Sequence, residues 1–232
     1  MKKKHFIELR NSLRRRGFWV DVINGEFVLD QWYSKSNFCE MLDLLTSLQI
    51  SIKIGERGIR LEPNTLVPNE IFNRIECFNR DELRFIPSSL TIPQGWRHNP
   101  NNDLSILEID CGIASLVFAL NKVGLYTSMS CDGHGQIEPK IWLNGYSHIQ
   151  TIRKILIEAN QEVSFAYDWE INKEGGSSVL TAKKRLSNDN WDVKKIQDDA
   201  LALSEYVYNN FSFPFDRIPN IGVFNNDGRL YN

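Results

Sequence analysis

The chain has 232 residues, of which 42% are hydrophobic and 24% charged, and its formal net charge is −2. This composition is typical of a globular protein, and it argues against disorder and against a whole-surface nucleic-acid binder. The longest apolar run, 116–120, is far shorter than the roughly 20 residues of a membrane helix, and no apolar signal core follows the lysines at 2–4. We therefore expect a cytoplasmic protein that does not bind membranes.

The spacing of the cysteines also agrees with a cytoplasmic protein. Cys39, Cys77, Cys111 and Cys131 lie far apart, and no two of them form a C-x-x-C pair. A chain of this length can build a core without covalent cross-links. We expect all four to be reduced thiols.

In the first half, residues 1–86, patterns predict three helices and two hairpins. A basic helix over 3–16 ends at Gly17, and strands 18–23 and 26–29 flank Asn24-Gly25, a strong hairpin signal. Ser34 or Ser36 caps the next helix, whose apolar residues recur at three- and four-residue steps. Strands over 50–54 and 59–61 follow, and a helix opens at Pro68.

Residues 87–104 are rich in proline and asparagine and are predicted to form a linker. Ser105-x-x-Glu108 is typical of a capping box, which predicts a helix from there to Gly124, with Asp110 in its first turns.

The second half, residues 105–211, continues after that helix with two more hairpins and two more helices. We expect strands at 125–130 and near 141–143, a helix capped by Ser147, strands at 163–169 and 179–182 across Gly175-Gly176, and a last helix capped by Asp189 or Asn190. Residues 212–232 are predicted to form an extended strap pinned by aromatic side chains, or a peptide that docks on a partner.

Both halves are thus predicted as helix, hairpin, helix, hairpin, helix. This order indicates the α+β class, with two pseudo-repeated halves that each have an antiparallel sheet covered by helices on one face.

The turn between the first two strands of the second half concentrates chemical side chains. Cys131 and His134 have C-x-x-H spacing, so that a thiolate and an imidazole can reach one ion such as zinc. Asp132 and Glu138 offer oxygen ligands for a harder cation. Further ligands would have to come from distant parts of the chain: Cys77, His98, Cys111 or His148.

The same residues also fit a nucleophilic site. Cys131 would be the thiolate, His134 the base, and Asp132 or Asp168 the carboxylate that orients the histidine. The alternative is structural: the Cys131 thiol turns inward as a small apolar group, Asp132-Gly133 makes the turn, and His134 is only exposed.

The turn could also bind a ligand through its backbone and hydroxyl groups. Gly133 and Gly135 let amides approach an anion, and the polar Thr127, Ser128 and Ser130 precede them. The segment Ser128-Met129-Ser130-Cys131-Asp132-Gly133 resembles the serine-cysteine-glycine segment of the wybutosine tRNA methyltransferases. His134 stands where that family has arginine, and no other motif is shared, so the resemblance implies no activity here.

A basic patch in the first helix suggests a third kind of function. Arg10, Arg14, Arg15 and Arg16 could contact nucleic-acid phosphates, or could be a solvated helix face. The leading hypothesis is a module that binds a small molecule or a protein through residues 127–138. An enzyme using Cys131 and His134, and a nucleic-acid-binding protein, are the alternatives.

Overall fold

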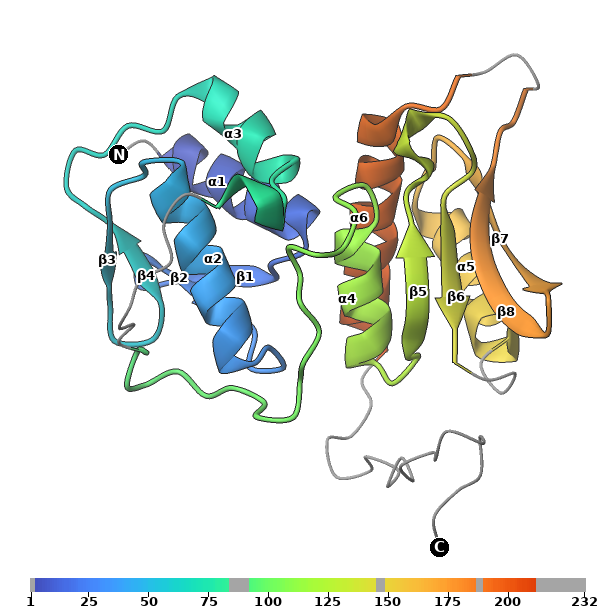
Figure 1. Cartoon of the computed structure of the whole chain (residues 1–232), viewed down its shortest axis with the longest axis horizontal. Helices are drawn as coiled ribbons and strands as arrows, with labels where there is room; N and C mark the ends of the chain where they lie inside the picture. The colour runs from blue at the N-terminus through green and yellow to red at the C-terminus, as the bar shows by residue number, and fades with distance from the viewer. Residues whose placement is uncertain (1–2, 84–91, 145–148, 187–189, 212–232) are drawn as a thin grey trace, which may run out of the picture.

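The computed structural model describes residues 3–83, 92–144, 149–186 and 190–211. Within these ranges it has the α+β class expected from the sequence, with six α-helices and two antiparallel four-stranded sheets. Figure 1 shows the two sheets on opposite sides of the molecule, with helices α4 (Ala114–Lys122) and α6 (Val193–Asn210) between them. None of the described helices is both long and apolar enough to span a membrane.

The first half follows the local sequence signals closely. Its elements are α1 (Lys3–Arg16), β1 (Val20–Ile23), β2 (Glu26–Leu29), α2 (Lys35–Ser47), β3 (Ile52–Ile54), β4 (Ile59–Leu61), α3 (Asn69–Glu76) and a 3-10 turn η1 (Arg80–Glu82). The Asn24-Gly25 hairpin is confirmed: both residues have positive φ, 53° and 78°, as a two-residue turn of this hand requires. Ser34, and not Ser36, caps α2 in a reciprocal capping box with Asn37.

The second half has α4, β5 (Thr127–Cys131), a 3-10 turn η2 (Gly133–Gly135), β6 (Lys140–Leu143), α5 (Ile149–Glu162), β7 (Asp168–Glu174), β8 (Ser177–Lys183) and α6. The first sheet has the strand order β1-β2-β4-β3, and the second has β5-β6-β8-β7. Both halves therefore run helix, hairpin, helix, hairpin, helix, and in both sheets the second strand pairs with the fourth.

The prediction that a helix begins at Ser105 is wrong, because α4 begins only at Ala114. The residues of the expected capping box bond to other parts of the chain instead. The Ser105 hydroxyl and the Ile106 N–H both donate to the Glu40 carboxylate on α2, and Glu108 pairs with Arg80. Tertiary partners thus hold 105–113 as a loop of consecutive turns, and Asp110 lies in this loop and not in a helix.

Other boundaries also differ, and the two largest differences are in the second half. The third strand of the second half, β7, begins at Asp168 and not at 163. Every residue of β7 pairs with a residue of β8 across the Gly175-Gly176 turn. The last helix is capped by Asp192, whose carboxylate accepts the N–H groups of Lys194 and Lys195. The expected Ser147 and Asp189 caps and the 212–232 strap lie outside the described residues.

The described part of the expected linker, 92–104, lacks helix and strand and packs on the first half. Trp96 is buried against Phe38, with ring centroids 4.9 Å apart, and its indole N–H donates to the Leu29 carbonyl at 2.9 Å. Asn102 is buried as well and donates to the Trp32 carbonyl.

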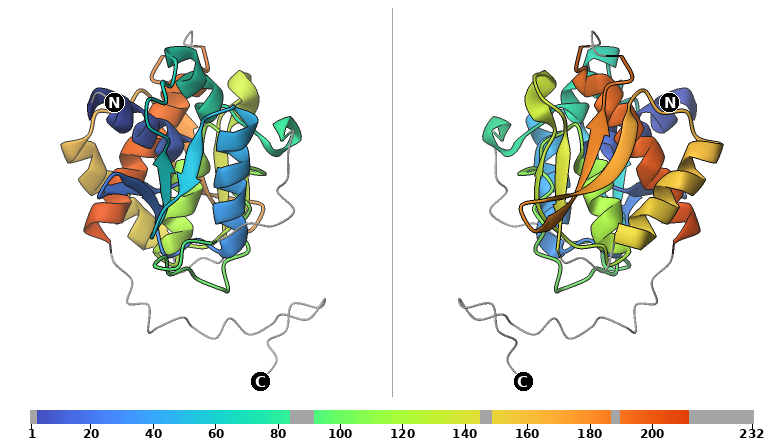
Figure 2. Two further views of the ribbon diagram at one scale, coloured as in Figure 1. Left: turned by 90° about the vertical axis from the view of Figure 1, so that its left-hand side faces the viewer. Right: turned by 90° about the vertical axis from the view of Figure 1, so that its right-hand side faces the viewer.

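The two faces of the second sheet differ in character. Ile141, Leu180 and Ile171 lie opposite one another on β6, β8 and β7 and belong to the buried core. The neighbouring row, Cys131, Lys140, Thr181 and Glu170, runs across all four strands on the other face. The right-hand view of Figure 2 looks onto this outer face, with α4 and α6 behind the sheet.

Candidate functional site

The turn after β5 is built around the buried carboxylate of Asp132. Its Oδ2 accepts the Gly112 N–H at 3.0 Å, and its Oδ1 accepts the His134 N–H at 2.9 Å. Gly133, His134 and Gly135 then have consecutive positive φ values of 77°, 50° and 71°. Histidine adopts this region at a cost that glycine avoids, so His134 is held in a strained conformation between two glycines.

Asp110 is the residue that the fold adds to this turn. Its Oδ2 accepts the Asp132 N–H at 3.1 Å and lies 3.8 Å from His134 Nε2. The sequence pattern placed Asp110 in the first turns of a predicted helix. The non-helical path of 105–113 brings it to the turn after β5, and no local signal in the sequence indicated that path.

Three different donor atoms converge here. Cys131 Sγ lies 3.8 Å from His134 Nε2, and the donor atoms of Asp110, Cys131 and His134 all lie within 4.8 Å of one another. Tetrahedral zinc bonds of about 2.3 Å to sulfur and about 2.0 Å to nitrogen would place those two atoms roughly 3.5 Å apart. A shift of a few tenths of an ångström would thus bring thiolate and imidazole to ligand spacing.

The groups behind these donors are also placed in a defined way. His134 Nδ1 lies 3.3 Å from Asp132 Oδ1, so the ring nitrogen away from the cluster faces a carboxylate. The Gly133 N–H donates to Cys131 Sγ at 3.4 Å. The His134 side chain is 67% exposed, which leaves one side of the cluster open to solvent.

The other expected ligand-binding residues lie in β5 and the turn and make contacts of their own. The Thr127 hydroxyl accepts from Asn121 on α4, and Ser128 donates to the Trp142 carbonyl. Ser130 is half-buried and lies in the row of the sheet's inner face, opposite Ile141. A Cβ on Gly133 would lie 3.2 Å from the Glu138 backbone.

The more distant candidates also have other partners. Asp168 pairs with Arg185, Glu138 pairs with Lys140, and the His98 ring lies against Trp96. Among the described residues, Asp110, Cys131 and His134 form the one group of three or more possible metal ligands. His148 lies outside the described residues.

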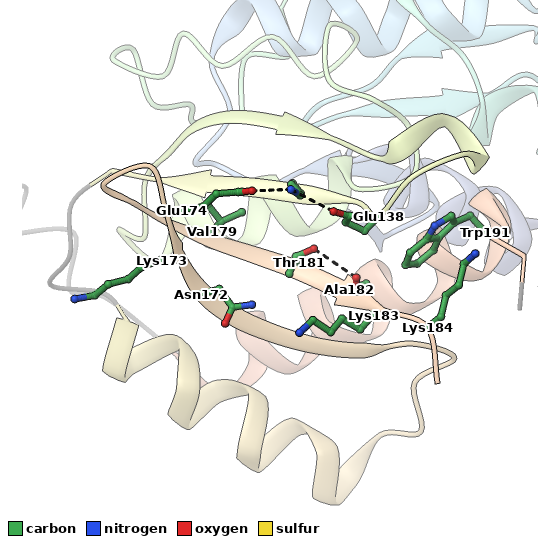
Figure 3. Close-up of a pocket in the computed structure, with 11 residues that line it drawn as sticks. Glu138, Asn172, Lys173, Glu174, Val179, Thr181, Ala182, Lys183, Lys184 and Trp191 are labelled. Atoms are coloured by element: carbon green, nitrogen blue, oxygen red, sulfur yellow. Dashed lines mark hydrogen bonds and ion pairs between the residues drawn. The ribbon is translucent and has the colours of Figure 1, made fainter. Parts of the chain in front are cut away.

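A trough on the outer face of the second sheet adjoins the turn (Figure 3). It has a volume of about 600 Å³ and is lined by Glu138, Lys140, Asn172, Lys173, Glu174, Val179, Thr181, Ala182, Lys183, Lys184 and Trp191. In its floor the Lys140 ammonium bonds Glu174 at 2.9 Å and Glu138 at 3.3 Å, and these two carboxylates raise the pKa of Lys140. Cys131 lies opposite Lys140 on the adjacent strand, and a Cβ on Gly135 would lie 3.7 Å from the Trp191 carbonyl, so turn and trough are contiguous.

The arginines of α1 form hydrogen bonds and ion pairs with other residues of the same chain. Arg16 is fully buried, and it donates to the Phe78 and Ile106 carbonyls. Arg14 pairs with Asp21 and Glu205, Arg15 pairs with Glu76 and Asp198, and Arg10 bonds Asn11. Because Arg16 offers no exposed atom to a phosphate, the described structure lends the nucleic-acid hypothesis no support from it.

Comparison with known proteins adds no family to this description. No protein-family model matches the chain, and no curated protein and no solved structure is detectably similar to it. The functional argument therefore rests on the geometry of the site.

Proposed function

We propose that this protein binds a zinc-class divalent ion through Asp110, Cys131 and His134, and that the ion faces a ligand held in the adjoining trough. The observation that carries the proposal is the convergence of the three donors within 4.8 Å. Sulfur, nitrogen and oxygen ligands together favour zinc over the hard cations calcium and magnesium, which prefer oxygen alone.

The surrounding groups suit a metal better than they suit an isolated histidine. A metal-bound imidazole usually gives its other N–H to a carboxylate, which fixes the ring and its tautomer. Asp132 stands at that position, 3.3 Å from Nδ1, and is itself fixed by the Gly112 N–H. A thiolate and one carboxylate would also balance the two positive charges of the ion.

Three protein ligands leave a coordination position for water or a ligand, as in catalytic zinc sites. The exposed side of His134 provides this opening. The trough offers a ligand paired charges at Lys140 and one aromatic wall at Trp191. These features suit a small polar ligand with a flat or apolar part. They support the hypothesis that the protein binds a small molecule and not another protein at this place.

A second candidate function is nucleophilic catalysis without a metal. Cys131 Sγ at 3.8 Å from Nε2 and Asp132 at 3.3 Å from Nδ1 give the order thiol, imidazole, carboxylate. Asp110 argues against it, since its carboxylate lies 3.8 Å from the same Nε2 and would repel a neighbouring thiolate.

Titration with Co²⁺ separates the two candidates, because cobalt replaces zinc and shows an intense near-ultraviolet band when a thiolate binds it. We expect one equivalent to bind, Cys131→Ser to lose the band, and Cys39→Ser, a control on α2, to keep it. No stoichiometric binding, or an unchanged band in Cys131→Ser, would overturn the metal proposal. In the absence of metal, alkylation of Cys131 much faster than Cys39 would then favour the nucleophile.

We also infer that the two halves are pseudo-repeated units. The shared order of elements and the shared strand order, with the second strand beside the fourth, support this inference. In this arrangement the proposed site elaborates a hairpin whose counterpart in the first half needs only Asn24-Gly25.

A further inference from the structure

Another pocket lies in the first half of the chain, beside strands β1 and β2. It has a volume of about 660 Å³, which is typical of sites for small molecules. Its walls come from these two strands, from the loop between β3 and β4, and from residues 94–97. It shares none of its described lining residues with the trough on the second sheet.

The loop between β3 and β4 is fixed from two sides at this pocket. The buried Glu26 carboxylate accepts three consecutive N–H groups of the loop at 2.7–3.0 Å. The Gly95 N–H donates to the Glu56 carbonyl at 2.8 Å, and a Cβ on Gly95 would lie 3.2 Å from Arg57 Cγ. These contacts bring Arg57 and Arg97, which are far apart in the sequence, to the same pocket.

The two acidic side chains of the lining already have partners outside it. Asp21 pairs with Arg14 of α1 at 2.5 Å. Asp30 accepts from the Lys122 ammonium of α4 at 2.7 Å and from the Tyr208 hydroxyl of α6 at 2.5 Å. Because cations behind the lining pair with both carboxylates, these acids do not neutralise the arginines of the pocket.

The two arginines of the lining lack such partners. Neither the Arg57 nor the Arg97 guanidinium has a hydrogen bond or an ion pair with any described residue, and both residues are exposed. The carboxamides of Gln31 and Gln94 add neutral donors to the same walls. The pocket therefore has an excess of positive charge and of N–H donors.

From this arrangement we infer that the pocket binds the phosphate group of a small organic molecule between Arg57 and Arg97. A guanidinium binds a phosphate through two parallel N–H···O bonds, and two guanidinium groups match the double negative charge of a phosphate monoester. A carboxylate has one charge and would leave the second arginine unpaired. The organic part has an apolar wall at Ile23, which is 38% exposed, and at the half-buried Val28.

The test is isothermal titration calorimetry of the full-length protein with phenyl phosphate. A chelator is present, so that no ion in the proposed metal site binds the phosphate. We expect one molecule to bind per chain, with an affinity that falls as the salt concentration rises. Inorganic phosphate should compete for the same place but bind at least about threefold more weakly, because it makes no contact with the apolar wall. Equal affinity for both probes would overturn the assignment of an organic ligand.

Variants of single cations locate the binding site. Arg57→Gln and Arg97→Gln should each weaken phenyl phosphate binding at least about tenfold, because each removes charge-assisted hydrogen bonds. Two controls should keep the wild-type affinity: Arg74→Gln removes an exposed arginine of α3, and Lys184→Gln removes a cation of the trough. No saturable binding by the wild-type protein, unchanged affinity in either pocket variant, or weaker binding in Lys184→Gln would overturn the inference. None of these outcomes depends on the proposed metal site.

Discussion

His134 combines a metal-binding side chain with an unfavourable backbone conformation, so replacing it should separate stability from function. Its φ and ψ are 50° and 31°, in the left-handed region. That region costs a residue with a Cβ roughly 1–2 kcal/mol, while glycine loses about 0.5–1 kcal/mol through the greater freedom of its unfolded chain. His134→Gly should therefore be more stable than His134→Ala by about 0.5–1 kcal/mol.

The measurement is urea unfolding of both variants with a chelator present, which removes any contribution from a bound ion. The imidazole is two-thirds exposed, so its own packing contributes little to stability. Both variants should nevertheless lose Co²⁺ binding. If the alanine variant were as stable as the glycine variant, the left-handed turn described here would not be the conformation in solution.

Three further predictions concern buried carboxylates and the glycine behind the site. Burial raises the pKa of Glu26, but hydrogen bonds from the N–H groups of 56–58 and from Arg60 outweigh it and leave this pKa below 4.5. Glu26→Gln should lower the free energy of unfolding by about 2–3 kcal/mol at pH 7. This difference from the wild type should vanish as the pH falls through the lowered pKa. A difference in unfolding free energy that stays constant between pH 7 and 3 would refute this. Burial, together with Glu40, raises the pKa of Asp43 to about 6. Wild-type stability should therefore fall as the pH rises from 4 to 6. Asp43→Asn should be more stable than the wild type by about 1–3 kcal/mol at pH 8 and equally stable at pH 4. Gly112→Ala puts a Cβ 2.8 Å from the Asp132 carboxylate, so Co²⁺ affinity should drop at least about tenfold; unchanged affinity would mean that Asp132 does not support the site.

Elements with strong local signals could be predicted from the sequence. The basic helix over 3–16 and the hairpin around Asn24-Gly25 depend on residues that are neighbours in the chain, and both were predicted correctly. The Cys131 and His134 part of the site was visible for the same reason, because the two residues are three apart.

The rest of the site depends on contacts between distant segments. Ser105 has the form of a helix cap, but its hydroxyl bonds Glu40, which is 65 positions away. That bond helps to keep 105–113 out of a helix, and the resulting loop brings Asp110 to His134. Arg16 resembles the less buried Arg14 and Arg15 in the sequence, and only the distant carbonyls that it bonds show that it is fully buried.

The central claim is that one ion joins the 105–113 loop to the turn after β5. The direct measurement is the Zn²⁺ affinity of Asp110→Asn beside that of Glu108→Gln, an acid in the same loop that pairs with Arg80 on the surface. The wild-type protein and Glu108→Gln should bind one equivalent with the same affinity, and Asp110→Asn should bind at least about tenfold more weakly. Equal affinity in all three, or no stoichiometric binding by the wild-type protein, would contradict the claim.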